Sequence, residues 1–456
     1  MIHRLRLALV PAYLVLCLLL GGASAAGFWG NMLLQLAALP IVAAAALSRR
    51  GTPLSTASRQ LLLLAGLAVL LILLQLVPLP PGLWTALPGR AGIAEGLRMI
   101  GQPLPWLPLS LDPYRTIASA LWLLPALAAL LGILILGAYR ASWLTAGLAA
   151  VTIVSIAIGA LQISGGDQSP WYFYAITNYG TTTGFFSNAN HFATLMVATI
   201  PFLAALYLTA VARGRSVQKS SGLFVVLAGA LVVTMGGIAI NMSIAGIGLS
   251  VPVLAASLLM ILSRRRRLPR WTPVLVALLL VGSVAAVFTA PFANNLTSQG
   301  AAAQEDSRYN SFRKTSAAAV EFMPAGSGIG TFQAIYRTHE DPGGVDRFYM
   351  NHAHSDLLEL ALETGAPGLA LLLAFLLWWG LRTSAIWRAE EPDYYARAAT
   401  VATAAIMAHS LVDYPLRTAA VSVLFAISCA LMAEPRAAAR RSRERSKSEA
   451  RHLEAD

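Results

Sequence analysis

Apolar runs of about twenty residues recur along this chain, and they decide what it can fold into. A helix needs roughly 20 predominantly apolar residues to cross the hydrocarbon core of a bilayer. In lipid, that helix must also satisfy its own backbone hydrogen bonds. The chain has 456 residues, of which 57% are hydrophobic and 12% are charged, whereas soluble domains carry about 25% charged residues. We therefore predict an all-α, polytopic helical membrane protein.

We predict about twelve transmembrane helices, followed by a basic tail at 435–456. They fall near residues 7–25, 28–47, 60–78, 116–137, 142–163, 191–212, 222–241, 245–263, 271–290, 365–381, 397–414 and 417–434. Spans 1–9 then occupy residues 1–290, and spans 10–12 occupy residues 357–434. The outside loops lie near 79–115 and 164–190, with a much longer one at 291–356. A loop of that length is usually functional.

The basic residues follow the positive-inside rule. With the N-terminus inside, alternation of the spans leaves 24 of the 33 Lys and Arg residues inside and nine outside. The net charge of +12 therefore reports topology rather than affinity for nucleic acid, and both termini are predicted to be cytoplasmic. The tail from Arg436 to Arg451 is expected to lie against anionic headgroups or to be disordered. A cleaved signal peptide over residues 1–26 is an alternative that leaves the remaining topology unchanged.

The loop at 164–190 carries an aromatic run and an Asn-rich segment. The run W171-Y-F-Y174 fits either a girdle at the membrane interface or a platform on which sugars stack. Asn188, Asn190 and His191 follow where the chain re-enters the membrane. Asn is a favoured residue at the start of a helix, so a capping role is one interpretation of this segment.

The long outside loop concentrates positive charge on one predicted helix. Residues 307–321 favour a helix that Pro324 ends, and G326-S-G-I-G-T-F332 predicts a tight corner after it. A guanidinium fork matches the oxygens of phosphate, so the cluster is a candidate site for a membrane-anchored phosphate or pyrophosphate. A solvated helix face is the alternative. The basic residues of this helix are Arg308, Arg313 and Lys314.

Two histidines, His352 and His354, precede the segment that returns to the membrane. An imidazole titrates near neutral pH, and an ionisable group at a membrane boundary is a candidate for function. If residues 355–364 are helical, their three carboxylates share one face, and one of them could orient His354 as a base. These carboxylates belong to Asp356, Glu359 and Glu363.

Other roles for these polar residues stay open. The H-x-H spacing of His352 and His354 weakly suggests zinc, but no third ligand is fixed by the sequence, and we predict no metal site. A structural histidine is a further alternative. His409 and Asp413 stand four residues apart near an outer boundary, where a mutual hydrogen bond that fixes two helices is the expected role.

The ordered set of these motifs resembles the O-antigen ligase / O-antigen polymerase family of bacterial inner-membrane proteins. The pattern H354-S-x9-G365-x-x-G368 resembles the signature of that family. Three further segments resemble its other motifs in the same order. They are G184-F-F-S-N-A-N-H191, then R308-x3-F312 with the run P-A-G-S-G-I-G-T-F at residues 324–332, and H409-S-L-V-D-Y-P-L-R417.

The resemblance implies transfer of a glycan from undecaprenyl pyrophosphate to a hydroxyl acceptor at the periplasmic face, without metal or another cofactor. His354 would be the base that activates the acceptor, or else a contact to the transition state, and Arg308 would hold the donor pyrophosphate. The runs P-L-P-P-G-L-W at residues 78–84 and P-L-S-L-D-P at residues 108–113 look like the exopolysaccharide branch. A polymerase of O-antigen or exopolysaccharide is therefore the preferred activity, and ligation of O-antigen to lipid A-core is the alternative.

Two positions depart from the family pattern. Many members have Arg before the glycine in T181-T-T-G184, and Arg in place of Ile244 in S243-I-A-G246. Other residues would then bind the donor pyrophosphate or glycan. The candidate substrate-binding residues are Arg313, Lys314, Asn190 and Arg347.

The expected partners are a lipid-linked glycan, its acceptor, membrane lipids and polysaccharide assembly proteins, but not nucleic acid. A transporter is another class that twelve helices permit. Transporters often show internal repeats and polar sites at the midplane, which this sequence lacks. A non-catalytic partner in polysaccharide assembly is the remaining alternative, and it would tolerate alanine at His354.

Overall fold

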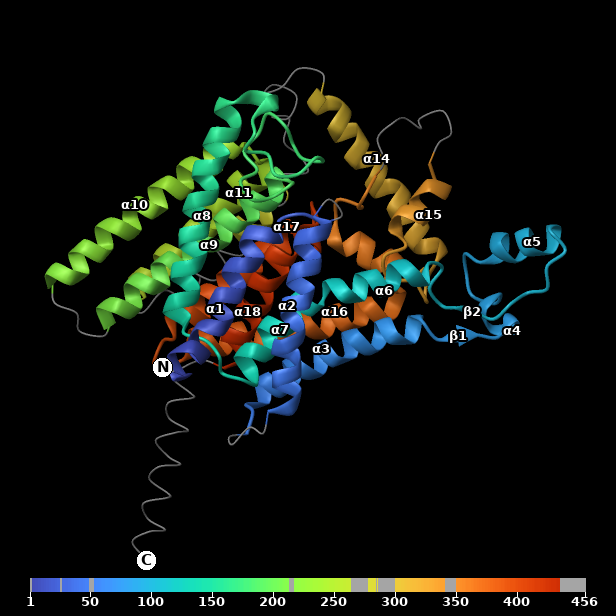
Figure 1. Ribbon diagram of the computed structural model, residues 1–456, viewed down its shortest axis with the longest axis horizontal. Helices are drawn as coiled ribbons and strands as arrows, with labels where there is room; N and C mark the ends of the chain where they lie inside the picture. The colour runs from blue at the N-terminus through green and yellow to red at the C-terminus, as the bar shows by residue number, and fades with distance from the viewer. Residues whose placement is uncertain are drawn as a thin grey trace, which may run out of the picture.

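Long helices dominate the computed structural model (Figure 1). Eight helices of the described part of the chain are long and apolar enough to cross a membrane. The all-α, polytopic fold is therefore confirmed, whereas the count of twelve spans stays a prediction. The structure describes residues 2–24, 27–48, 53–212, 217–263, 278–283, 285, 300–340 and 350–434.

The described helices coincide with eleven of the predicted spans. The N-terminal part contains α1 (Ile2–Leu20), α2 (Phe28–Leu47), α3 (Thr56–Gln75), α6 (Pro113–Trp122), α7 (Leu124–Leu134), α8 (Ala141–Ser164), α9 (Ala189–Ala212), α10 (Val217–Asn241) and α11 (Ile244–Leu262). The C-terminal part contains α14 (Gly300–Glu321), α15 (Phe332–Thr338), α16 (Asp356–Arg388), α17 (Tyr394–His409) and α18 (Ala419–Ala433). Most of the predicted ninth span, 271–290, lies outside the described residues.

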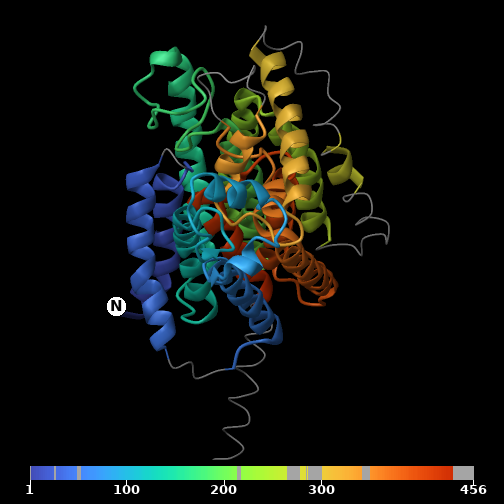
Figure 2. The ribbon, with the colours of Figure 1, turned by 90° about the vertical axis from the view of Figure 1, so that its right-hand side faces the viewer.

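Helices α9, α17 and α18 form the centre of the bundle. Helix α9 is apolar on all sides and is buried over most of its length, as expected for a helix with neighbours all around it. It packs against α17, α11, α10 and α8, while α18 packs against α7, α17 and α1. Figures 1 and 2 show these central helices surrounded by the others.

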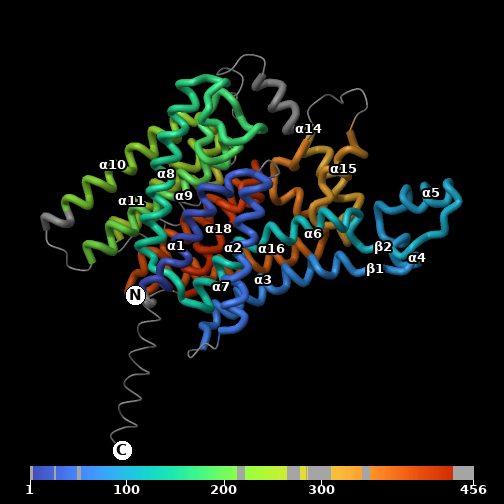
Figure 3. The backbone as a smooth tube through the Cα atoms, in the orientation of Figure 1, coloured from blue at the N-terminus to red at the C-terminus, as the bar shows by residue number. Residues whose placement is uncertain are grey.

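The first outside loop forms a small arm at one end of the molecule (Figure 3). In it, β1 (Pro78–Leu79) pairs with β2 (Leu107–Pro108), and α4 (Pro81–Trp84) and α5 (Ala91–Met99) lie between them. The fully buried Arg90 side chain donates to the carbonyl of Leu109 at 2.6 Å and to that of Gly326 at 3.1 Å. The arm is therefore anchored to the Gly-rich corner of the long loop.

The corner predicted at residues 326–332 is confirmed, and it caps a break in α16. Three of its glycines have positive φ, at 79°, 111° and 85°, which costs little without a Cβ atom. The backbone N–H of Ser327 donates to the carbonyl of Leu362, and that of Gly328 to the carbonyl of Glu363, each at 2.9 Å. These bonds satisfy carbonyls that the break deprives of their helical donors.

The break itself lies at Gly365, whose φ and ψ are 59° and −147°. Almost only glycine adopts this conformation. A Cβ atom here would also lie 2.1 Å from the carbonyl oxygen of Pro324. The sequence predicted that the chain re-enters the membrane at residue 365, and the kink divides α16 at that position into a short polar segment and a long apolar one.

Helix α17 ends earlier than predicted. The sequence suggested a span to residue 414, with His409 and Asp413 one turn apart on the same helix. In the structure α17 ends at His409, and the backbone N–H of Asp413 donates to the carbonyl of His409 in the turn that follows. Pro415 then opens the short 3-10 helix η3 (Pro415–Arg417). The predicted helical pair was therefore wrong, and Asp413 stands in the turn at 410–418.

Candidate functional site

The loop before α16 is fixed by a residue between its two histidines. Ala353 is fully buried in a small core that includes Phe322, Phe332 and Leu362. Ser355 then caps α16 by accepting from the backbone N–H of Leu358 at 3.4 Å. Because both ends of this short segment are held, the imidazoles beside Ala353 have defined positions.

His354 has an uncommon backbone conformation, with φ at 53°. This left-handed region costs a non-glycine residue roughly 1–3 kcal/mol, and such strain clusters at functional sites. Its Nδ1 atom lies 3.8 Å from Oδ1 of Asp413. The surrounding fold therefore holds the His354 imidazole toward a carboxylate that is distant in sequence.

Asp413 is the centre of a buried polar cluster. Its side chain is 1% exposed, Asn190 donates to its Oδ2 at 2.6 Å, and Nε2 of His191 lies 3.6 Å from its Oδ1. Burial alone would raise the pKa of Asp413, but the neighbouring imidazoles of His191 and His354 hold that pKa well below its usual range. Asp413 is therefore an ionised carboxylate at neutral pH.

The second-loop motif G184-F-F-S-N-A-N-H191 brings Asn190 to this cluster. Gly184 has φ 58°, and a Cβ atom there would lie 2.1 Å from Oγ of Ser155. Asn188 accepts from the backbone N–H of Asn190 at 2.8 Å, so the capping interpretation holds for Asn188. The Oδ1 atom of Asn190 accepts from Ser243 at 2.7 Å. Asn190 thereby joins the start of α9, the start of α11 and Asp413.

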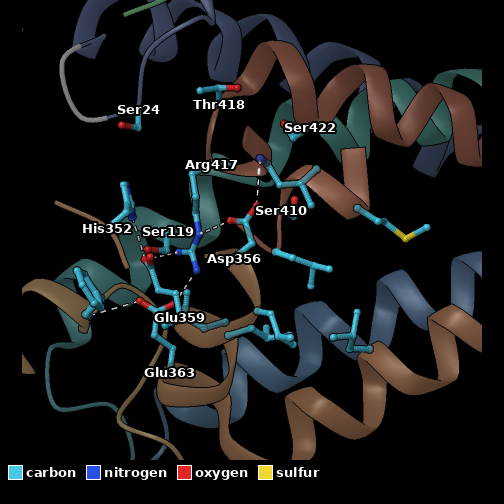
Figure 4. Close-up of a pocket in the computed structure, with 18 of the residues that line it drawn as sticks. Ser24, Ser119, His352, Asp356, Glu359, Glu363, Ser410, Arg417, Thr418 and Ser422 are labelled. Atoms are coloured by element: carbon cyan, nitrogen blue, oxygen red, sulfur yellow. Dashed lines mark hydrogen bonds and ion pairs between the residues drawn. The ribbon is translucent and has the colours of Figure 1, made fainter. Parts of the chain in front are cut away.

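A second cluster forms around Arg417, as Figure 4 shows. Its guanidinium nitrogens lie 3.5 Å from Asp356, 3.2 Å from Glu359 and 3.1 Å from Glu363. The prediction that these three carboxylates share a helix face is therefore confirmed. Arg417, from the turn before α18, is the shared cation that the sequence did not indicate.

Glu359 orients His352 rather than His354. Its Oε1 atom lies 2.9 Å from Nδ1 of His352, and its Oε2 atom accepts from the backbone N–H of Ala353 at 3.1 Å. The expectation that a carboxylate of this helix would orient His354 was wrong, because Asp413 faces that imidazole instead.

Tyr414 lies between the two clusters. The rings of His352 and His354 lie with their centroids 4.5 and 5.2 Å from its ring, and that of His191 lies at 4.8 Å. Its hydroxyl is 3.3 Å from Nδ2 of Asn351. One phenol side chain therefore brings three imidazoles into a single zone.

A large cavity adjoins the Arg417 cluster. Its volume is about 1100 Å³, which suits a substantial ligand. Figure 4 shows its polar end, where His352, Glu359, Arg417 and Ser410 lie close together. The other end is apolar. Its lining comes mainly from α16 and α17, including Leu372, Leu376, Trp379 and Met407.

Residues 223–373 match the family described as O-antigen ligase. The match covers about a third of the chain, and this segment is therefore similar to the O-antigen ligase domain. No curated protein sequence matches the chain. The resemblance stated from the sequence is therefore confirmed at the level of the family.

The O-antigen ligase domain contains His352, His354 and the polar segment of α16. Asn190, Asp413 and Arg417 lie outside the matched residues and pack against it in the fold. The two clusters thus combine residues from inside and outside the domain.

Four predicted site residues remain, and the structure describes the side chains of two of them, Arg313 and Lys314. Arg308 lies on α14, in the part whose side chains are outside the described residues, and Arg347 lies outside the described residues altogether. Arg313 is exposed, and the ammonium of Lys314 lies 5.9 Å from the ring centroid of Tyr336. Neither Arg313 nor Lys314 lines the cavity, so their roles stay predictions.

Proposed function

We propose that the protein transfers a glycan from undecaprenyl pyrophosphate to a hydroxyl acceptor at the periplasmic face, as a polysaccharide polymerase. The observation that carries this proposal is the position of His354. It belongs to an O-antigen ligase domain, and its imidazole faces the buried carboxylate of Asp413. An imidazole held by a buried, ionised partner is placed either to take a proton or to contact the transition state.

The proposed reaction is a single displacement at the anomeric carbon. The acceptor oxygen forms a bond to that carbon as the bond to the phosphate oxygen breaks, and the electron pair leaves with the pyrophosphate. The reaction then inverts the configuration. His354 contacts the reacting atoms, and Arg308 stabilises the negative charge that develops on the leaving group. The protein needs no metal or other cofactor for this step.

Further basic residues are proposed to hold the donor. Arg313, Lys314 and Arg347 supply positive charge for its pyrophosphate or glycan. Asn190 supports the same site through Asp413 and Ser243. Because both ends of its amide have protein partners, we assign Asn190 a positioning role.

The proposed setting is the bacterial inner membrane, with both termini in the cytoplasm. The expected substrates are a lipid-linked glycan and either a growing glycan or lipid A-core. Eight apolar helices and the similarity to the O-antigen ligase domain support a multi-pass membrane protein. The preference for a polymerase rests on the Pro-rich first loop.

The deciding experiment sizes the lipid-linked glycans of a strain that lacks this gene. Single repeat units that accumulate on undecaprenyl pyrophosphate identify the polymerase. Long lipid-linked chains that never reach their final acceptor identify the ligase instead. Unchanged glycans would overturn both activities. Restoration by the wild-type gene, but not by a gene encoding His354→Asn, separates an enzyme from a non-catalytic assembly partner.

A further inference from the structure

His352 has the geometry of an oriented base beside the large cavity. Its side chain lines the cavity and is 17% exposed, so a ligand can reach it. Its Nδ1 atom lies 2.9 Å from Oε1 of Glu359. His354 is not among the described residues that line this cavity.

Glu359 holds this imidazole firmly. The carboxylate is 1% exposed, Ala353 donates its backbone N–H to one oxygen at 3.1 Å, and Arg417 lies 3.2 Å from the other. An ionised carboxylate only accepts hydrogen bonds, so the proton of a neutral His352 sits on Nδ1. Nε2 is then the nitrogen with a free lone pair.

The charges at the polar end of the cavity favour a neutral ligand over a pyrophosphate. Asp356, Glu359 and Glu363 surround the guanidinium of Arg417, and Arg115 pairs with Asp112 at 3.2 Å. Both guanidinium groups that line this end therefore already have carboxylate partners, so neither is free to bind a pyrophosphate. Side chains that carry hydroxyl groups also line this cavity. They belong to Ser24, Ser119, Ser410, Thr418 and Ser422.

We propose that His352 is the base that takes the proton from the acceptor hydroxyl, and that Glu359 is its positioning residue. This inference rests on the proposed function and gives the two histidines different roles. The acceptor glycan enters the cavity, and its hydroxyl proton moves to Nε2 of His352. The freed oxygen bonds to the anomeric carbon, and the bond to the phosphate oxygen breaks toward the pyrophosphate. His354 contacts the phosphate side of the reaction.

His352 and His354 lie close enough to each other to act on the same reaction. Both rings lie against Tyr414, with centroids 4.5 and 5.2 Å from that of its ring. They face different carboxylates, Glu359 and Asp413. Both imidazoles therefore lie in one zone, with the cavity beside His352 and the Asp413 carboxylate beside His354.

The test compares His352→Ala with wild-type protein in lipid nanodiscs, using a purified undecaprenyl-pyrophosphate-linked repeat unit as donor and acceptor. We expect kcat to fall by roughly 10²–10⁴-fold, with the KM for the repeat unit unchanged. Added imidazole should restore part of kcat, because the shortened side chain leaves room beside Glu359. Glu359→Gln should lower kcat without changing the KM for the repeat unit.

His339→Ala is the matched control. His339 also pairs with a carboxylate, that of Glu321, at 2.9 Å, but it does not line the cavity. It should retain the wild-type kcat with or without imidazole. A His352→Ala variant with wild-type kcat would overturn the assignment and leave the proposed function standing. The assignment would also be overturned if His352→Ala lost kcat, if imidazole did not restore it, and if the unfolding midpoint of the variant were lowered. Absence of transfer by wild-type protein would overturn both.

Discussion

Arg417 and Glu363 form an ion pair that joins two distant parts of the chain. Their Nη2 and Oε2 atoms are 3.1 Å apart, and the other carboxylate oxygen accepts from the backbone N–H of Gly330 at 2.8 Å. One carboxylate therefore connects the turn before α18 with the Gly-rich corner. In the loop that carries the histidines, the Asn351 carbonyl accepts from Gln333, and Nδ2 of Asn351 lies 3.3 Å from the hydroxyl of Tyr414 in that turn.

Replacing Arg417 by methionine should destabilise the fold. The change leaves the carboxylates of Asp356, Glu359 and Glu363 without their cation, and breaking a buried pair costs about 3–5 kcal/mol. The thermal unfolding midpoint in detergent measures the effect. Arg98→Ala is the control, because Arg98 and Glu95 form an exposed pair that contributes little. Equal unfolding midpoints for Arg417→Met and Arg98→Ala would contradict the inference that the ion pairs of Arg417 stabilise the fold.

Gly365→Ala should also destabilise the fold, for a different reason. Alanine would adopt the φ of 59° at a cost of roughly 1–3 kcal/mol, and its Cβ atom would meet the carbonyl of Pro324. Gly380 lies in the same helix with open space around it, so Gly380→Ala should be neutral or stabilising by up to about 1 kcal/mol. Unfolding midpoints of the two variants check the difference. A tolerated Gly365→Ala would mean that the kink is not required.

The sequence predicted most of the fold because its signals are local. Apolar runs located the described helices, and the glycines at 326–330 located the corner. The i, i+3, i+7 spacing of Asp356, Glu359 and Glu363 placed them on one helix face. Each of these inferences uses neighbouring residues and the period of a helix.

The partners of the histidines were not predictable in the same way. Asp413 approaches His354 because α17 ends at His409 and the chain turns, and the sequence suggested a helix to residue 414. Arg417 reaches Glu363 across 54 positions of the chain. Such contacts depend on how helices pack, which local patterns do not specify. The resemblance pointed to the segment at 409–417 but not to these pairings.

His354→Asn should preserve the fold and abolish most transfer. Asparagine tolerates the left-handed backbone at this position better than most residues, so the unfolding midpoint should stay close to that of the wild type. Loss of the imidazole should lower kcat by at least about 100-fold. Transfer from a lipid-linked donor by protein in nanodiscs measures this. Full activity in the variant would remove His354 from the site and favour a non-catalytic role.

Asp413→Asn should lower both activity and stability at neutral pH. The variant keeps the shape of the side chain but loses the charge that faces His191 and His354. A hydrogen bond to a charged group contributes about 1.5–3 kcal/mol, so kcat should fall roughly 10–100-fold. Thr152→Val is a matched control, because it removes a buried hydrogen bond to Thr199 within the bundle. It should lower the unfolding midpoint while leaving kcat unchanged.

The pH dependence of stability gives an independent test of Asp413. Because its pKa is depressed in the folded protein, the carboxylate stabilises the fold above the pKa of an unfolded Asp, about 4. That contribution is lost as the pH falls through the lower pKa of the folded state. The difference in unfolding midpoint between wild type and Asp413→Asn should therefore have its largest value at pH 7. It should decrease only in strong acid. A difference that disappears between pH 7 and pH 5 would mean that Asp413 is not held as an ionised partner of the histidines.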